Sequence, residues 1–374
     1  MANQNIKIVS LVWYKTLPAQ FGGQQAIVGL NEALGKQENL ICLCSKNNQP
    51  SGDESFTTYP ILPNSKWQFI NPITWWIIYS FCKKEKTTHV IVEHPYHVIA
   101  AWIIKMKLNV SIIHRSHNIE FERFKQLNKK YWRIIFYAEK WICEIAKVNL
   151  FITKEDALKA IKQFSIEPSK CFLLPHEIKE KNISKKAQST QQIKAKYNIA
   201  NDNNIFLFNG TLDYEPNANA VESIANFLIP ELNKINPNFI FIITGRIDNK
   251  SFDYLHQLAN KQLIFTGRVT NIEDYFLACD VYVNPVNIGG GVQTKTLEAL
   301  SYHLNVVCFE NMLNGIEVDL VKDKIFVVEN HNWKQFADKI IRANLHQTTT
   351  PSAFFKYQNY DNHLPKLLDL IRLN

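Results

Sequence analysis

The chain has 374 residues, of which 46% are hydrophobic and 20% are charged, and its formal net charge is +8. This length exceeds what one hydrophobic core usually supports, so the sequence predicts two domains of ordinary size. The seven cysteines are dispersed and odd in number, which argues against a disulfide framework and favours reduced thiols.

The first residues predict a β-strand and no export signal. The segment MANQNIKIVSLVWY lacks a basic region followed by a long apolar region and a small-residue cleavage site. Apolar segments further on, such as 74–81 and 98–104, are shorter than the roughly 18 residues that a membrane-spanning helix needs. We therefore expect a cytoplasmic protein without a transmembrane anchor.

Short apolar runs rich in Ile, Val and Phe alternate along the chain with longer stretches of helical periodicity. Continuously apolar strands separated by helices predict parallel sheets covered on both faces, and hence two doubly wound α/β domains. A polar, Lys-rich stretch from Glu177 to Lys196 is expected to link them. The expected strands are 6–12, 40–44, 89–93, 110–114, 149–152 and 171–174, then 205–209, 239–244, 263–266, 281–284, 306–309 and 325–328.

In the first half, glycines and polar residues follow some of the expected strands. Gly22 and Gly23 precede a helix and indicate a loop that binds a phosphate or a sugar, although this signal is weak by itself. His117 lies in a segment crowded with His, Arg, Asn and Glu. A histidine after a buried strand is more often structural, but this density of polar groups favours a functional His117. Both interpretations stay open.

The positive charge is concentrated in the first half of the chain. Residues 1–175 contain 22 Lys and Arg against 13 Asp and Glu, a balance of +9, which leaves −1 for the remainder. The densest basic segment, 123–140, interleaves Lys and Arg with aromatic residues. Such a helix could rest on an anionic membrane, with a peripheral location at the inner face of the plasma membrane, but a solvated basic helix with an aromatic core face is the more common interpretation of this pattern. Without a recognised nucleic-acid-binding signature, we expect no nucleic-acid partner.

In the second half, several strand ends lead into loops with glycine or polar residues. Asn209 and Gly210 follow one strand, and Asn217 is predicted to cap the next helix. Gly267, Arg268 and Val269 form a second loop of this kind, and Arg246 follows the strand 239–244. Ligands in doubly wound sheets bind beyond the carboxyl ends of the strands, so these residues are donor-site candidates.

The run from Asp280 to Leu300 carries the strongest signal. An apolar strand is followed by Gly289, Gly290 and Gly291, then by Val292, Gln293 and Thr294 at the start of an amphipathic helix. The glycines permit a close backbone approach, and the free N–H groups of the helix attract an anion. Lys295 and Glu298 share one helical face, which suits a diphosphate beside a vicinal diol. The alternative is a turn whose glycines serve only tight packing.

These spacings resemble those of the retaining glycosyltransferases of the GT-B fold, the large group called family 4 or glycosyl transferases group 1. The resemblance covers most of the chain. It implies an α/β fold of two Rossmann-like doubly wound domains facing a central cleft: an acceptor-binding domain over 1–176, a nucleotide-sugar domain over 177–350, and a C-terminal helix within 351–374 that crosses back. The segments that carry it are GGQQ, SHNIEFERF, LFITKEDALKAI, CFLLPHEI, FNGTLDYEPNANAVESI, FTGRVTNIEDYF and PVNIGGGVQTKTLEAL.

The resemblance also implies roles for individual residues. It places Glu298 at the ribose hydroxyls, the loop of Gly267 to Thr270 at the base, and Lys295 with the glycine-rich helix start at the diphosphate. His117 is implied near the transferred sugar, which makes His117 and Lys295 the catalytic candidates. Gly290 stands where the family often has a first glutamate. The Arg and Lys that many members place early in the second domain are missing from 209–220. The positive charge must therefore come from elsewhere, with Lys295 as the first candidate, Arg268 as the second and Arg246 as the third.

The expected reaction is transfer of a sugar from a nucleoside diphosphate sugar to a hydroxyl of a saccharide or lipid-linked acceptor, with retention. No acidic pair suits a divalent metal, so metal-independent transfer without a further cofactor is predicted, in cell-surface polysaccharide or glycolipid synthesis. Three alternatives stay open: a nucleotide-sugar epimerase of the same fold, a non-catalytic protein derived from a transferase, and an NAD-dependent oxidoreductase. The last lacks the expected G-x-G-x-x-G after its first strand.

Overall fold

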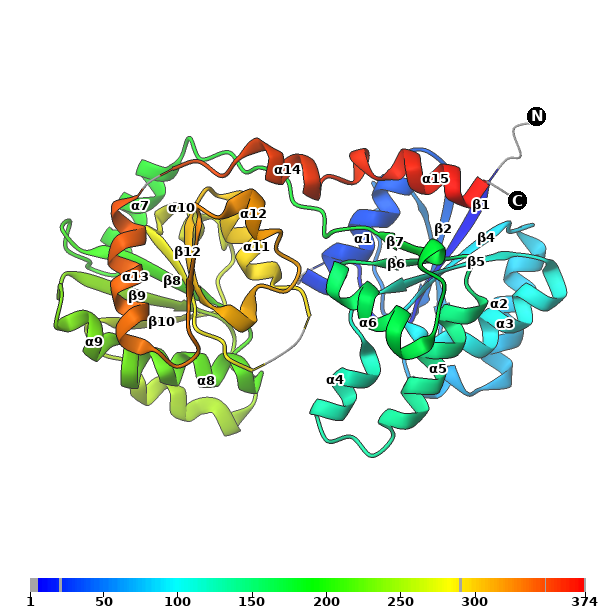
Figure 1. Cartoon of the computed structure of the whole chain (residues 1–374), viewed down its shortest axis with the longest axis horizontal. Coiled ribbons are helices and arrows are strands. Elements are labelled where there is room, and N and C mark those ends of the chain that lie inside the picture. Colours follow the sequence, from blue (N-terminus) through cyan, green and yellow to red (C-terminus); the bar gives the residue numbers. More distant parts are fainter. Residues whose placement is uncertain (1–5, 20–21, 289–290, 347, 373–374) are drawn as a thin grey trace. The chain divides into compact units, whose positions relative to one another are not determined.

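The computed structural model describes residues 6–19, 22–288, 291–346 and 348–372, and its chain divides into two compact units (Figure 1). Unit 1 comprises residues 1–177 together with 358–374, and unit 2 comprises residues 178–357. The C-terminal residues therefore belong to the same compact unit as the N-terminal ones. Each unit is built around its own parallel sheet.

The sheet of unit 1 has seven parallel strands in the order β3-β2-β1-β4-β5-β6-β7. Side chains that alternate along β1 enter two different hydrophobic clusters, with Val9 and Leu11 in one and Ile8 and Val12 in the other, as the two-residue period of a strand requires. Its strands are β1 (Lys7–Val12), β2 (Asn39–Ser45), β3 (Thr57–Leu62), β4 (His89–Glu93), β5 (Ser111–Ser116), β6 (Val148–Phe151) and β7 (Cys171–Leu173).

Helices cover both faces of this sheet. On one face, α1 (Gly22–Gly35) and α15 (Leu364–Arg372) pack against β1, β2 and β4. The other face is covered by α2 (Pro72–Lys84), α3 (Val98–Leu108), α4 (Glu120–Gln126), α5 (Trp132–Ile145) and α6 (Lys154–Phe164). Short 3-10 helices complete the unit: η1 (Lys66–Phe69), η2 (Pro95–His97), η3 (Pro168–Lys170) and η7 (Tyr360–Asn362).

The sheet of unit 2 has six parallel strands in the order β10-β9-β8-β11-β12-β13. The chain moves from β8 outward to β10 and then returns to build the other half from β11, so the topology reverses between β8 and β11. Its strands are β8 (Asn204–Asn209), β9 (Phe239–Thr244), β10 (Leu263–Gly267), β11 (Val281–Asn284), β12 (Asn305–Phe309) and β13 (Ile325–Val328).

The helices of unit 2 enclose a large apolar core that includes Phe206, Phe241 and Phe276. One run is continuous from α8 (Glu215–Ser223) through the π-helical turn η4 (Ile224–Leu228) into α9 (Ile229–Asn233). The others are α7 (Lys186–Lys196), η5 (Lys250–Leu258), α10 (Glu273–Ala278), α11 (Thr294–Ser301), η6 (Glu310–Met312), α12 (Val318–Val321), α13 (Trp333–Leu345) and α14 (Ser352–Gln358).

The prediction of two doubly wound α/β sheets is confirmed, and two local predictions are corrected. Strand β3 was not expected, because Pro60 and its half-exposed side chains conceal an edge strand. The single helix expected over 354–373 is divided into α14 and α15, since the side chain of Asn359 accepts a hydrogen bond from the N–H of Asp361 and starts η7. Among the described residues, no helix is both long and apolar enough to cross a bilayer.

Candidate functional site

The predicted residues of unit 2 lie beyond the carboxyl ends of four parallel strands. Loops after β8, β9, β10 and β11 carry Gly210, Arg246, Arg268 and the glycine-rich segment. In a parallel sheet these ends meet at one edge, and a ligand site is expected where the strand order reverses. Here that reversal lies between β8 and β11, so the loops that follow these two strands flank the expected position.

Lys295, in the first turn of α11, points its ammonium group toward the end of β8. Its Nζ donates a hydrogen bond of 2.7 Å to Oδ1 of Asn217 and lies 5.0 Å from the ring centroid of Phe208. Burial lowers the pKa of Lys295 to about 8. Since no carboxylate forms an ion pair with it among the described residues, this cation keeps its charge available for an anion.

Gly210 leaves space for this ammonium group. A Cβ at residue 210 would overlap the ammonium of Lys295 and lie 2.9 Å from Nδ2 of Asn217. The same loop packs against Gly245 after β9, where a Cβ would overlap the carbonyl oxygen of Gly210. The two glycines therefore bring the ends of β8 and β9 close together, and Lys295 fills the space beside Gly210.

The start of α11 is fixed without a capping side chain. Gln293, which precedes the helix, caps no backbone N–H group with its side chain, and the first turn holds no acidic residue. Asn284 at the end of β11 holds the segment through a bond of 3.2 Å from its Nδ2 to Oγ1 of Thr296. Among the described residues no bond engages the backbone N–H groups of Lys295 and Thr296, which thus remain available to an anion. Gly289 and Gly290 lie outside the described residues.

Residues of the loop before α11 and of a neighbouring turn pack against the start of the helix. Gly291 has a φ of +92°, which favours glycine, and the backbone N–H of Thr294 donates to the carbonyl of Val292 at 2.9 Å. Gly315 packs against Val292 so closely that a Cβ there would lie 2.7 Å from Cγ1 of Val292. The helix start is therefore braced by a second glycine turn.

Glu298 lies one turn after Lys295 on α11. Burial raises the pKa of its carboxyl group, and Lys181 opposes this shift. Among the described residues no group donates a hydrogen bond to its carboxylate, whose oxygens therefore remain free as acceptors. The predicted site residue Asn209 already uses its side-chain oxygen, because its Oδ1 accepts a hydrogen bond of 2.7 Å from the hydroxyl of Tyr282.

The two arginine candidates are more exposed than Lys295. Arg246 pairs with Asp248 at 2.9 Å, with half of its side chain exposed. Arg268 follows Gly267, whose φ of +66° turns the chain after β10, and is itself exposed, while Val269 packs on the core of unit 2. Because Arg246 is already paired and both side chains are solvated, Lys295 is the better placed of the three to hold a buried anion.

In unit 1, His117 lies in a buried polar cluster beyond β4 and β5. Its Nε2 lies 2.7 Å from Oε2 of Glu93, and its ring stacks on His94 with 4.5 Å between centroids. His94 has a φ of +75° and a ψ of +158°, a backbone conformation that costs energy for a residue with a Cβ. Such strain is often found at functional sites, and His94 was not among the predicted residues.

Arg115 anchors this cluster from the buried side. Its Nη1 lies 3.6 Å from Oε1 of Glu93 and donates to the carbonyl of Ala26 at 2.8 Å. Its Nη2 donates to the hydroxyl of Tyr360, also at 2.8 Å. The network thus joins β4, β5 and α1 to the C-terminal residues of the same unit.

Burial decides the protonation of these groups. It lowers the pKa of His94 to about 4, with the neighbouring His117 adding to the effect, and it also lowers the pKa of His117 itself, where Arg115 adds to the effect. Burial raises the pKa of Glu93, against the opposing influence of Arg115. Both imidazoles are therefore neutral at neutral pH.

The other predicted residues of unit 1 stand at the start of α1. Gly22 and Gly23 form its first turn, and a Cβ at Gly23 would meet the hydroxyl of Tyr14 at 3.6 Å, an ordinary contact. Space alone therefore does not require glycine at residue 23. A donor-binding role for this pair remains a prediction.

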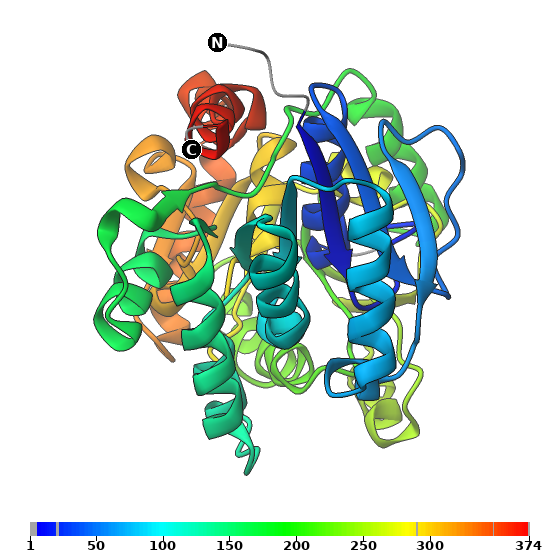
Figure 2. The same cartoon turned by 90° about the vertical axis from the view of Figure 1, so that its right-hand side faces the viewer.

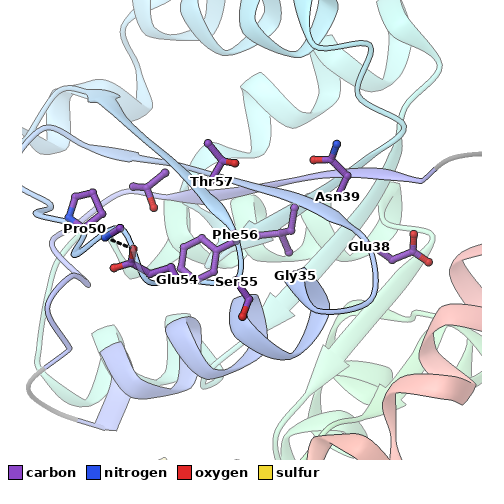
Figure 3. A pocket seen from close by; sticks show the side chains of 11 residues that line it. Gly35, Glu38, Asn39, Pro50, Glu54, Ser55, Phe56 and Thr57 are labelled. Carbon is purple, nitrogen blue, oxygen red and sulfur yellow. Dashed lines mark hydrogen bonds between the residues drawn. The ribbon is translucent and has the colours of Figure 1, made fainter.

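A separate surface pocket of unit 1 contains none of the predicted residues. It measures about 500 Å³ and lies between the end of α1 and β3, with Glu38, Glu54 and Phe56 among its lining residues (Figure 3). Glu54 already accepts backbone hydrogen bonds from Ser51 and Gly52. In the described part of the chain, no group of three or more His, Cys, Asp or Glu side chains is arranged to hold a metal ion.

Residues 203–344 match the family described as Glycosyl transferases group 1. This segment of unit 2 is therefore similar to group 1 glycosyltransferases, and it includes Lys295, Glu298 and the glycine-rich loop. The match agrees with the resemblance to that group stated from the sequence. Comparison of the chain with curated proteins gives no match.

Solved structures of similar fold cover nearly the whole chain. Sucrose-phosphate synthase from Thermosynechococcus elongatus is 15% identical with a TM-score of 0.73, covering 98% of both chains. The Anabaena protein HepE, solved with UDP and glucose, is 12% identical with a TM-score of 0.71, covering 97% of this chain and 99% of its own. WaaG, a glycosyltransferase of lipopolysaccharide biosynthesis, is 13% identical with a TM-score of 0.67, covering 98% and 100%. These likenesses show that the chain has the GT-B fold.

Sequence reasoning missed several residues of both clusters. Asn217 does not cap α8, because it lies within the first turn and its side chain bonds the carbonyl of Thr211 at 2.7 Å and the ammonium of Lys295. Glu93 and Arg115 belong to the polar strand ends noted from the sequence but were given no role, and Tyr360 was not considered. For Glu93 and Arg115 a signal existed, since charged residues at the ends of apolar strands are rarely buried without a partner.

Proposed function

We propose that this protein is a glycosyltransferase that transfers a sugar from a nucleoside diphosphate sugar to an acceptor hydroxyl, with retention of configuration and without a metal ion. The observation that carries the proposal is the ammonium of Lys295, held by Asn217 beside the uncapped start of α11 within the segment that is similar to group 1 glycosyltransferases. An anion placed there meets both a cation and the N–H groups of a helix start.

The diphosphate is the leaving group of this reaction. As the bond between the anomeric carbon and the phosphate oxygen lengthens, negative charge grows on the diphosphate. Lys295 and the first-turn N–H groups of α11 are already oriented before the reaction, so they stabilise that charge without reorganising. Asn217 and Gly210 serve as positioning residues, because the first holds the ammonium and the second leaves space for it.

Glu298 is proposed to bind the ribose of the nucleotide. Its carboxylate accepts no hydrogen bond from the described residues, and two adjacent hydroxyls are matched donors for its two oxygens. The nucleoside would then lie one helical turn from the diphosphate. HepE was solved with UDP, and we propose a nucleoside diphosphate sugar as the donor here by the same fold.

His117 is proposed to serve the transferred sugar. Burial raises the pKa of Glu93 and Arg115 opposes this shift; with Glu93 ionised, the Nε2–H of His117 donates to its carboxylate and leaves Nδ1 as an acceptor. A neutral imidazole fixed in this way can accept a hydrogen bond from a sugar hydroxyl. Glu93 thus sets the tautomer of His117, and Arg115 favours the ionised form of Glu93 that this tautomer needs.

The acceptor is proposed to be a saccharide or a lipid-linked saccharide in the synthesis of a cell-surface polysaccharide or glycolipid. Two structures of similar fold, WaaB and WaaG, are described as lipopolysaccharide glycosyltransferases, which supports this direction. The alternatives predict different products. An epimerase would invert a sugar centre without transfer, and a binding protein would show no turnover.

A two-stage experiment tests the proposal. The first stage is a thermal-shift screen of UDP, GDP, ADP and CMP, since a nucleotide at 100 times its Kd stabilises the folded state by about 2.7 kcal/mol. The second incubates the matching nucleotide sugars with and without acceptors and resolves the products. Release of the nucleoside diphosphate coupled to sugar transfer supports the proposal. Binding without turnover across the acceptors, or epimerisation, would contradict it.

A further inference from the structure

The outer side of one helical layer of unit 1 exposes an unusual amount of apolar surface. Five side chains, Trp67, Ile73, Trp76, Ile134 and Tyr137, are each between 66% and 72% exposed. Isolated exposed hydrophobic residues are common, but a set of large ones gathered on one layer indicates an interaction surface. The exposed apolar residues of this layer are Trp67, Ile70, Ile73, Trp76, Trp102, Met106, Leu127, Tyr131, Ile134 and Tyr137. Together with the Lys and Arg residues of segments 64–84, 98–108 and 123–137, they form what we call the aromatic-basic surface.

These residues come from neighbouring elements. Helices α2, α3 and α5 pack side by side over the same sheet face, as Figure 2 shows from their outer side. η1 and the start of α2 follow the carboxyl end of β3, and α4 follows that of β5, so both lie toward one edge of the sheet. Between them, Phe69 of η1 stacks on Tyr96, whose hydroxyl donates to Glu120 of α4 at 2.6 Å.

Three segments of these elements carry only positive charge. Segments 64–84, 98–108 and 123–137 contain three, two and five Lys or Arg residues, and none of them contains Asp or Glu. The carboxylates that flank these segments are paired or buried: Glu85 pairs with Lys7, Glu122 with Lys159 and Glu144 with Lys140, while Glu120 and Glu139 are buried. In the described part of the chain, no ion pair involves Lys129, Lys130 or Arg133.

Aromatic and basic side chains alternate most closely at the turn between α4 and α5. Both Lys125 and Arg133 lie 5.2 Å from the ring centroid of Trp132, and Phe124 packs on Tyr131 at 5.3 Å. In Figures 1 and 2 this turn extends beyond the ends of the strands. A protruding turn of this composition presents cations and aromatic rings to the same surface.

We propose that the aromatic-basic surface docks unit 1 on an anionic lipid bilayer. Tryptophan and tyrosine favour the boundary between headgroups and acyl chains, and exposed isoleucines gain by entering it. Lysines and arginines of the same surface attract anionic headgroups. A folded protein partner would have to offer acidic and apolar groups in a matching pattern, whereas a bilayer offers both everywhere. A nucleic acid would offer no apolar surface to the exposed side chains of Ile70, Ile73 and Ile134.

The docking surface deepens the proposed function by assigning a membrane-bound acceptor, but binding to lipid does not depend on turnover. The two are therefore tested separately. The probe is a set of vesicles of phosphatidylcholine alone or of phosphatidylcholine mixed with phosphatidylglycerol, sedimented with the full chain at low salt. We expect binding to the anionic vesicles, weakening as salt is raised, and little binding to the neutral ones.

Charge-reversal variants locate the surface. Lys129→Glu, Lys130→Glu and Arg133→Glu together should weaken binding to anionic vesicles on the order of a hundredfold or more. The matched control reverses Lys261, Lys322 and Lys334, which are exposed on unit 2, and should change binding much less. Trp67→Ser with Trp76→Ser tests the apolar part, with Ile235→Ser and Leu345→Ser as controls.

Each outcome decides the matter. Thermal unfolding and nucleotide binding are measured for every variant, and because the charge reversals lie on an exposed turn or its adjoining helix, a folded variant is available for the comparison. Failure of the unmodified protein to bind anionic vesicles would overturn the proposal, as would equal losses in the test and control variants. Binding to a single-stranded RNA probe with no binding to vesicles would assign the surface to nucleic acid instead. Loss of lipid binding with intact nucleotide binding supports docking independently of the reaction.

Discussion

Charged side chains are arranged differently at the carboxyl edges of the two sheets. In unit 1, Glu93, Arg115 and His117 are buried and interact with one another and with Tyr360. In unit 2, Lys295 is held by one neutral side chain, and no described donor bonds the carboxylate of Glu298. The first arrangement fixes the orientation of a few groups, while the second leaves opposite charges available to a ligand. Loss of a group should thus affect stability in unit 1 and affinity in unit 2.

The largest expected effect is on folding, from Arg115→Ala. This change leaves the buried carboxylate of Glu93 without its cation, and breaking a buried ion pair in this way costs about 3 to 5 kcal/mol. Denaturant unfolding followed by tryptophan fluorescence measures it, since seven of the eight tryptophans lie in unit 1. Lys159→Ala, which removes an exposed partner of Glu122, is the control and should cost about 1 kcal/mol or less. Similar losses in both variants would refute the buried network.

The next effect is on affinity, from Lys295→Met. Losing a charge-assisted contact costs about 1.5 to 3 kcal/mol, so the Kd for the diphosphate form of the nucleotide should rise roughly 10- to 150-fold. Calorimetry with that nucleotide measures the change. Arg246→Met is the matched control, because Arg246 is exposed and already paired with Asp248. A larger loss in the Arg246 variant would move the phosphate site away from α11.

Glu298→Gln tests whether the ribose and the diphosphate are bound by different residues of unit 2. If the carboxylate binds the ribose, the variant should bind the nucleoside diphosphate about tenfold more weakly, as expected for loss of a hydrogen bond to a charged group. Its affinity for inorganic pyrophosphate, which has no ribose, should be nearly unchanged. An equal loss for both ligands in competition calorimetry would show that Glu298 acts on the phosphates or on the fold.

The smallest expected effect is the pH dependence of binding. Burial lowers the pKa of Lys295 to about 8, so its ammonium loses its proton as the pH rises through about 8, and diphosphate affinity should fall with it. Stability changes in the opposite direction, because the unfolded chain keeps this proton to higher pH and a lowered lysine pKa therefore adds stability as the pH rises above about 8. Calorimetry across this pH range should show a slope that is lost in Lys295→Met. A slope unchanged in the variant would assign the titration elsewhere.

The sequence predicted the fold well because it depends on local pattern. Apolar runs such as FIFIIT at 239–244 are recognisable as buried strands without any knowledge of their neighbours. Strand β3 was not predicted, because Pro60 and alternating exposure are typical of an edge strand, whose sequence differs little from that of a loop. Helix α15 was expected, but the interruption at Asn359 depends on one side-chain bond.

The candidate site was predicted in part, for a physical reason. Lys295 and Glu298 could be paired from the sequence because helical spacing alone places them on one face. Asn217 was misassigned, since its contact with Lys295 joins residues 78 apart in the chain. Tyr360 was missed for the same reason, because its partner Arg115 is 245 residues away. Long-range partners of this kind follow from the fold and leave no periodic signal.

One structure would test the central assignment most directly: a crystal structure of the chain with the nucleoside diphosphate that gives the largest thermal shift. We predict the diphosphate at the start of α11, with an oxygen within hydrogen-bond distance of Nζ of Lys295 and the ribose hydroxyls at Glu298. A nucleotide bound away from α11, with Lys295 still bonded only to Asn217, would contradict this assignment.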